Sequence, residues 1–167
     1  MLGLPRKNRK GFTLIELLLV VTILSLLAVS VFVALDPAKR LKDTKNARRT
    51  ADVDTILAAV HQAIVDNKGS LPTNMPAAGT EVQLGTGVAG CAIAGAGGCT
   101  VVQVGCNDLL TGGVNLSKYL KTMPIDPDGG ATYTAAKTGY AVVVDANGIV
   151  TVRACGSESG LTISASR

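Results

Sequence analysis

The sequence predicts an α+β fold in which one long N-terminal α-helix precedes a small antiparallel β-sheet head. Residues 12–35 form an apolar run with a single charge, and apolar residues then recur at mostly helical spacing as far as Gly69. Two β-branched runs, 139–144 and 149–154, flank a turn that contains Asn147-Gly148, which is typical of a hairpin. Because the helix precedes the strands without βαβ alternation, we expect the sheet to lie on the helix.

The apolar run is long enough to cross a membrane. As a helix, residues 12–35 extend about 36 Å, compared with about 30 Å for the hydrocarbon core of a bilayer. A cleaved secretory signal peptide, cut near Ala28-Val29-Ser30, is one interpretation, and a plain membrane anchor is another. The run is longer than an ordinary signal-peptide core, and neither interpretation explains the carboxylate of Glu16 near its start.

A short motif accounts for the basic start, the apolar run and Glu16 together. Residues 10–17 have the sequence KGFTLIEL and follow the basic residues Arg6, Lys7 and Arg9. This segment resembles the prepilin signal of type IV pilins and type II secretion pseudopilins, which has a basic leader, Gly before the cleaved bond, Phe after it and Glu at the fifth mature position. The resemblance implies that a prepilin peptidase removes the leader 1–11 between Gly11 and Phe12. It also implies N-methylation of the new amine on Phe12.

The resemblance also implies a role for Glu16 in filament assembly. A carboxylate deep in a bilayer costs about 2.5–3.5 kcal/mol on insertion scales, so it usually marks function. In related filaments it is thought to pair with the N-terminal ammonium of a neighbour, here that of Phe12. Because an unpaired partner is penalised in lipid, this pair would bring an incoming subunit into register. The alternative is a Glu that snorkels to the interface.

Residues 36–69 are expected to form an amphipathic second half of the helix. Asp36-Pro37 interrupts the apolar run, and proline bends or ends a helix. Gly69 and the nearby Pro72 predict the helix end. The charged residues of 36–54 are expected to form a solvated face or, alternatively, ion pairs between subunits. His61 is expected to be a surface or packing residue of this helix.

The region 70–167 is expected to form a β head stabilised by disulfides. It has neither Phe nor Trp, so its core is modest and extra constraints are expected. All four cysteines lie in it, which fits an oxidising compartment: Cys91, Cys99, Cys106 and Cys155. Three pairings are possible, and we favour Cys91–Cys99 with Cys106–Cys155. Free buried thiols and a zinc site are the alternatives, although the sequence has no CxxC pair.

The local patterns of the head are weaker. Residues 70–99 are rich in Gly, Ala and Pro, which predicts an irregular connection or loop. Candidate strands lie at 100–104 and 131–134, and a helical turn is expected within 115–122. Asp126 and Asp128 flank Pro127 before two glycines, and such oxygen-rich loops suit Ca²⁺. The loop is similar to one near the calcium region of major pseudopilins, but Asp-Pro and Asp-Gly are also ordinary turn formers, which is the interpretation we favour.

Charge and motifs argue against nucleic-acid binding and catalysis. Without residues 1–11, the remaining Lys and Arg equal the twelve Asp and Glu, and residues 70–167 have no basic excess. No nucleophile–histidine–acid set and no phosphate loop is found, so no enzyme or cofactor is expected.

The resemblance implies a structural filament subunit, assembled with copies of itself. Its expected partners are prepilin peptidase, membrane lipid, and an inner-membrane assembly platform with its ATPase. We expect the precursor to span the bacterial inner membrane once, with the head outside the cytoplasm, and to move into an extracellular pilus that serves adhesion, motility, DNA uptake or secretion. A major pseudopilin of type II secretion is the nearest alternative, and a single-pass anchored binding domain is an alternative of another class.

Overall fold

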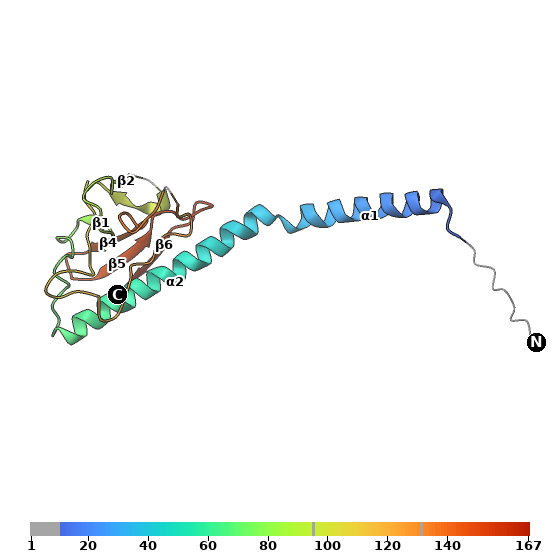
Figure 1. Ribbon diagram of the computed structural model, residues 1–167. Coiled ribbons are helices and arrows are strands. Elements are labelled where there is room, and N and C mark those ends of the chain that lie inside the picture. Colours follow the sequence, from blue (N-terminus) through green and yellow to red (C-terminus); the bar gives the residue numbers. More distant parts are fainter. Residues whose placement is uncertain (1–10, 95, 131) are drawn as a thin grey trace, which may run out of the picture. The chain divides into compact units, whose positions relative to one another are not determined.

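The computed structural model describes residues 11–94, 96–130 and 132–167 (Figure 1). The basic residues of the predicted leader, which precede Gly11, lie outside the described residues. The chain divides between Arg40 and Leu41 into two compact units. The first contains helix α1 (Leu14–Leu35), and the second contains most of helix α2 (Pro37–Asp66) and the β-sheet head.

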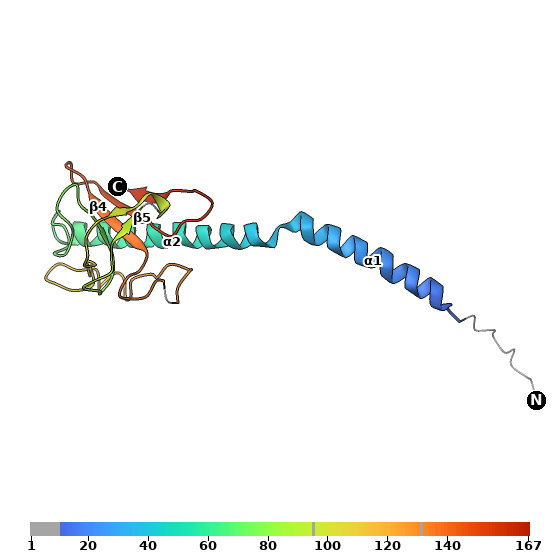
Figure 2. The same cartoon turned by 90° about the horizontal axis from the view of Figure 1, so that it is seen from above.

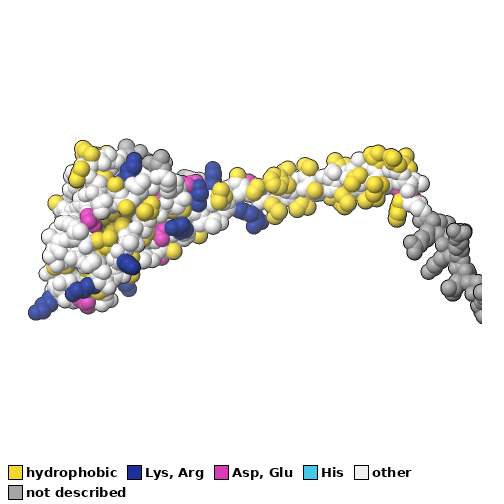
Figure 3. Space-filling view, in the orientation of Figure 1, with side chains coloured by type: hydrophobic (Ala, Val, Ile, Leu, Met, Phe, Trp, Pro, Cys, Tyr) yellow, Lys and Arg dark blue, Asp and Glu magenta, His cyan; other side chains and the backbone are white. Residues whose placement is uncertain are grey.

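Helix α1 is apolar and has no buried residue. Its 22 residues include only one charged side chain, Glu16, and large apolar side chains such as Leu26 and Val33 are more than 70% exposed. Apolar side chains follow the whole helix in the space-filling view (Figure 3). Within the described residues, the N-terminal helical region is the one stretch long and apolar enough to cross a membrane, and its most apolar window has a mean hydropathy of 2.9. An apolar surface of this size needs a cover.

Helix α1 ends where Asp36-Pro37 predicts an interruption. Asp36 has left-handed backbone angles (φ 37°, ψ 73°), and its N–H donates to Val33 O. Pro37 begins α2, because the first helical position needs no intrahelical N–H donor. The Asp36 side chain then accepts from Lys39 N at 3.2 Å, so that one residue caps both helices.

The main sheet has four antiparallel strands in the order β1-β4-β5-β6. The strands are β1 (Glu81–Gln83), β4 (Tyr140–Val144), β5 (Val150–Ala154) and β6 (Ile163–Ser166). The predicted hairpin is β4–β5, in which Val144 pairs with Val150 and Gly148 has a left-handed φ of 83° in the turn. A second, two-stranded sheet pairs β2 (Ile93–Ala94) with β3 (Thr100–Val101), and η1 (Ala96–Gly98) lies between them.

Some predicted elements differ from the structure. The strand predicted at 100–104 is shorter, since β3 ends at Val101. Of the strand predicted at 131–134, Ala131 lies outside the described residues and Thr134 forms only an isolated bridge with Lys137. β6 is not predicted, and β1 lies within the stretch predicted to be irregular.

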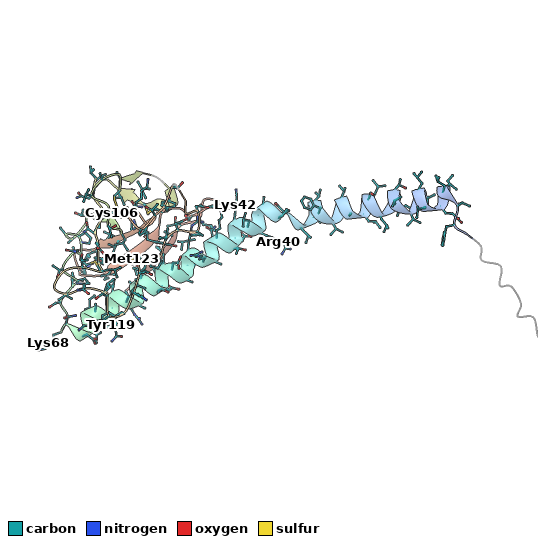
Figure 4. The ribbon with its side chains drawn as sticks, viewed as in Figure 1. Arg40, Lys42, Lys68, Cys106, Tyr119 and Met123 are labelled. Atoms are coloured by element: carbon teal, nitrogen blue, oxygen red, sulfur yellow. A yellow bond between two sulfur atoms is a disulfide. The ribbon has the colours of Figure 1, made fainter. Side chains whose placement is uncertain are left out.

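The core of the head lies between α2 and the main sheet (Figures 1 and 2). One face of α2 is buried from Val53 to Ala63, and it packs in the same cluster as Val142 and Val152 of the sheet. The predicted turn within 115–122 adds buried Leu116. In the same turn Tyr119 donates its hydroxyl to Asp66 at the end of α2 (Figure 4). The structure therefore confirms the α+β fold with the sheet laid on the helix.

Candidate functional site

The predicted cleavage site lies in an exposed segment before α1. Gly11 and Phe12 precede the helix in extended or irregular backbone, and Phe12 is 90% exposed. A methyl group built on Gly11 meets no atom of the other described residues within 4 Å. Gly11 and Phe12 are therefore exposed, and none of the described residues requires Gly at position 11.

A capping box holds Glu16 at the start of α1. Glu16 Oε2 accepts from Thr13 N at 2.9 Å and from the Thr13 hydroxyl at 2.8 Å, while Glu16 N donates to Thr13 Oγ1 at 3.3 Å. This reciprocal arrangement satisfies two backbone donors at the start of the helix, Thr13 N and Glu16 N. The carboxylate is thus directed back towards Phe12. Sequence reasoning singled out Glu16 but missed Thr13, although a Thr-x-x-Glu pattern before an apolar run is a recognisable sign of such a cap.

The four cysteines form two disulfides, but the predicted pairing is wrong. The bonds are Cys91–Cys106 and Cys99–Cys155, with Cα–Cα distances of 5.3 and 5.4 Å. Cys91 and Cys99 lie at opposite ends of the antiparallel β2–β3 pair, so they do not face each other. The short spacing between Cys91 and Cys99 favoured a bond between these two residues. Spacing alone reveals neither the β2–β3 hairpin nor the backbone hydrogen bond from Cys106 N to Gly87 O.

The packing explains the observed disulfide pairs. Cys91 N donates to Val104 O at 3.0 Å, which places Cys91 close to Cys106 on two neighbouring segments. Cys99 and Cys155 are fully buried and share a small cluster with Val101. The bond between them joins the β2–β3 sheet to the end of β5 in the main sheet.

The loop with Asp126 and Asp128 lies against α2 and forms ion pairs there. Arg49 forms a bidentate ion pair with Asp126: Arg49 Nε donates to Oδ2 at 2.7 Å, and Arg49 Nη2 donates to Oδ1 at 2.8 Å. Arg49 Nη2 also donates to Asp128 Oδ2 at 2.6 Å. The side chains of Arg49 and Asp126 are both completely buried. Such a bidentate pair is strong, and breaking it leaves an uncompensated buried charge.

Lys45 and Asn46 extend this network to the turn at Glu158. Lys45 pairs with Asp128 and lies 3.8 Å from Glu158 Oε1. Asn46 Oδ1 accepts from Arg49 Nη1 at 2.9 Å and from Glu158 N at 3.1 Å. The hydrogen bond from Lys45 and the nearby positive charges lower the pKa of Asp128, and the same hydrogen bond raises the pKa of Lys45. We name these residues the ionic cluster: Lys45, Asn46, Arg49, Asp126, Asp128 and Glu158.

The ionic cluster changes two interpretations made from sequence. The charged face expected for 36–54 is not wholly solvated, since Arg49 is buried and Lys45 is partly buried. Asn46 and Arg49 continue the three- and four-residue spacing of the buried stripe at Val53 and Ile56, and that spacing was the signal for their burial. His61 is half-buried on α2, in agreement with a packing role.

The donor set of the cluster does not fit Ca²⁺ well. Calcium takes six to eight oxygen ligands, but all four carboxylate oxygens of Asp126 and Asp128 already accept from Arg49 or Lys45. Within the ranges that the structure describes, no group of three or more metal-ligating side chains is arranged to hold an ion. Calcium at Asp126 and Asp128, the alternative that the sequence did not favour, would have to displace both Arg49 and Lys45.

Comparison with known protein families gives one match, at the N-terminus. Residues 6–32 match the family described as the prokaryotic N-terminal methylation motif. No curated protein and no solved structure matches the chain. The matched residues include Gly11, Phe12, the Thr13–Glu16 cap and most of α1. The chain therefore carries the prepilin-type signal that type IV pilins and pseudopilins share, and this supports a pilin-like or pseudopilin subunit.

Proposed function

We propose that this protein is a structural subunit of a type IV pilus-like filament, without enzymatic activity. The observation that carries the proposal is the methylation motif, which runs from the basic start into an apolar helix whose side chains are all exposed. In the precursor, lipid would cover this helix, and in the filament the equivalent helices of other copies would cover it. Both environments remove the same apolar surface from water.

Processing would come before assembly. A prepilin peptidase would cut between Gly11 and Phe12 on the cytoplasmic side of the inner membrane, and the new amine of Phe12 would be methylated. The head would lie on the other side, where the two disulfides suit an oxidising compartment. An assembly platform with its ATPase would then extract the subunit from the membrane into an extracellular pilus.

The capping box suggests how Glu16 is held until assembly. In the single chain the carboxylate already has two donors from Thr13, which reduces the cost of a charge in lipid. Cleavage adds an ammonium at Phe12, next to Thr13. We infer that a neighbour's ammonium replaces or joins the donors of Thr13, and that this charge-assisted bond sets the register between subunits.

Two substitutions and one fibre analysis test the proposal. Gly11→Ala should block removal of the leader, while Glu16→Ala should permit removal but reduce the number of filaments. Because a methyl group on Gly11 meets nothing in the part of the chain that the structure describes, a processing defect would reflect the peptidase and not misfolding. Mass spectrometry of sheared surface fibres should find this chain, beginning at methylated Phe12. Normal numbers of filaments from the Glu16→Ala protein would contradict the register role.

Two alternatives remain distinguishable. A type II secretion pseudopilin carries the same signal, so the motif does not separate it from a pilin; secretion that fails without this chain would favour it. An anchored binding domain that never polymerises is favoured by one observation, a cavity of about 510 Å³ in the head. Met123 (Figure 4), Arg48 and Asp108 are among its lining residues. Absence of the chain from isolated surface fibres would support the binding domain.

A further inference from the structure

We infer that Lys45 and Arg49 supply the positive charge that the carboxylates of the ionic cluster need, in place of any metal ion, so that the head is stable without calcium. The inference concerns the head alone and does not rest on filament assembly. It starts from three carboxylates, those of Asp126, Asp128 and Glu158, which converge from two loops on one face of α2.

The surrounding backbone fixes the position of the central carboxylate, that of Asp126. Asp126 N donates to Thr138 O at 2.9 Å, and Asp128 N donates to Asp126 Oδ1 at 2.9 Å. A Cβ on Gly156 would lie 2.6 Å from Asp126 Oδ2, and a Cβ on Gly139 would lie 2.8 Å from Asp126 Cβ. The backbone therefore approaches this side chain so closely that only glycine fits on two sides. A charge enclosed in this way needs a fixed counter-charge.

Arg49 supplies that counter-charge. Its Nε, Nη1 and Nη2 atoms all donate within the cluster, to Asp126, Asn46 and Asp128. The planar guanidinium matches the two oxygens of Asp126, and a metal ion would have to displace it from both. Because Arg49 is fully buried in the helix face that packs on the head, it cannot turn away into solvent.

Charge counting leads to the same conclusion. Lys45 and Arg49 bring two positive charges to three carboxylates, which leaves one negative charge. This charge lies nearest Glu158, whose side chain is 22% exposed although its Oε2 atom is buried without a hydrogen-bond partner among the described residues. A Ca²⁺ ion placed there would meet the ammonium of Lys45 as well as the carboxylates. Removal of either cation changes this balance: the carboxylate oxygens then lose their donors, and hard oxygen ligands of this kind are those that Ca²⁺ prefers.

Thermal unfolding of the full-length protein in detergent tests the inference. The sequence has three tyrosines, all in the head, and no tryptophan, so the near-ultraviolet circular dichroism of tyrosine reports the head alone. We expect the wild-type Tm to be the same in excess EDTA and in CaCl₂ at equal ionic strength. A wild-type Tm that falls in EDTA, or rises in CaCl₂ but not in NaCl, would overturn the inference.

Two variants extend the test. Arg49→Gln should lower the Tm by about 10–20 °C, because it leaves Asp126 buried and unpaired, and CaCl₂ should recover part of the loss. Lys45→Gln keeps the Arg49–Asp126 pair, so it should fold even if Arg49→Gln does not, and it should gain a smaller response to CaCl₂. Lys118→Gln removes an exposed cation of the head and is the matched control, with no response expected. A Lys45→Gln protein that is as indifferent to CaCl₂ as Lys118→Gln would contradict the claim that a helix cation stands in for a metal.

Discussion

Asp128 links the stability of the head to pH. Its pKa in the folded protein is lowered, first by the hydrogen bond from Lys45 and then by the charges of Arg49 and Lys45, while burial opposes the shift. The unfolded chain therefore binds the proton more tightly than the folded chain. A group of this kind contributes stability above its unfolded pKa of about 3.9, and the contribution is lost as the pH falls through its folded pKa.

Asp128→Asn should remove this pH dependence. We expect the variant to be less stable than the wild type at neutral pH, and the difference in Tm to shrink as the pH is lowered below about 4, because Asn cannot bind the proton. The measurement is the tyrosine circular dichroism of both proteins between neutral and acidic pH. Asp54→Asn removes an exposed carboxylate of α2 and controls for net charge. A Tm difference that stays constant over the whole range would show that the Asp128 charge does not matter.

The functional residues that could be identified from the sequence carry local sequence signals, whereas those that could not be identified depend on distant residues. Gly11, Phe12 and Glu16 belong to one contiguous motif, so a single segment predicts them. The role of Arg49 as a buried counter-charge depends on Asp126, which lies 77 residues further along the chain. A cation on a charged helix normally lies in solvent, and only its place on the buried stripe with Val53 marks it as different.

At the scale of elements, the same distinction separates the strands. The β4–β5 hairpin is predicted because its turn and both of its strands are adjacent in sequence. β1 has three residues and pairs with β4 about 60 residues away, and β6 is half-buried at the edge of the sheet. Their pairing depends on non-local contacts, which short propensity signals do not contain. The disulfide pairing was predicted wrongly for the same reason.

The two disulfides should contribute unequally to stability. Cys99–Cys155 closes a loop with a sequence separation of 56, and Cys91–Cys106 one with a separation of 15. On the chain-entropy model these loops correspond to about 4 and about 3 kcal/mol of stabilisation. Cys99 and Cys155 are also both fully buried, whereas Cys106 is partly exposed, so reductant should reach Cys91–Cys106 first.

Paired Cys→Ala variants check this expectation. Removal of Cys99 and Cys155 together should lower the free energy of unfolding more than removal of Cys91 and Cys106, as measured by urea titration of the full-length chain. Mild reduction followed by alkylation and peptide mapping should label Cys91 and Cys106 before the other pair. Labelling in the reverse order, or equal losses of stability, would show that the second sheet does not protect Cys99–Cys155.

At the scale of the whole molecule, the two compact units divide the proposed tasks. The large, highly exposed apolar side chains of α1 lie in the unit that ends at Arg40, and the buried core and both disulfides lie in the other. The ionic cluster also lies wholly in the second unit. The proposed filament subunit would use such a division, because its helix would change from lipid to protein surroundings while its head kept one fold.

The division predicts that the head folds without the first unit. Residues 41–167, produced in an oxidising compartment, should be soluble and monomeric by light scattering, because the apolar run of α1 is absent. Their tyrosine circular dichroism and Tm should match those of the full-length protein in detergent, since every partner of Arg49 and each disulfide is retained. The same segment should fail to enter filaments when it is expressed beside the full-length chain, because it lacks Phe12, Glu16 and α1. An unfolded or aggregated segment would mean that the head needs the N-terminal helix for stability, and the separation of anchoring from folding would then be wrong.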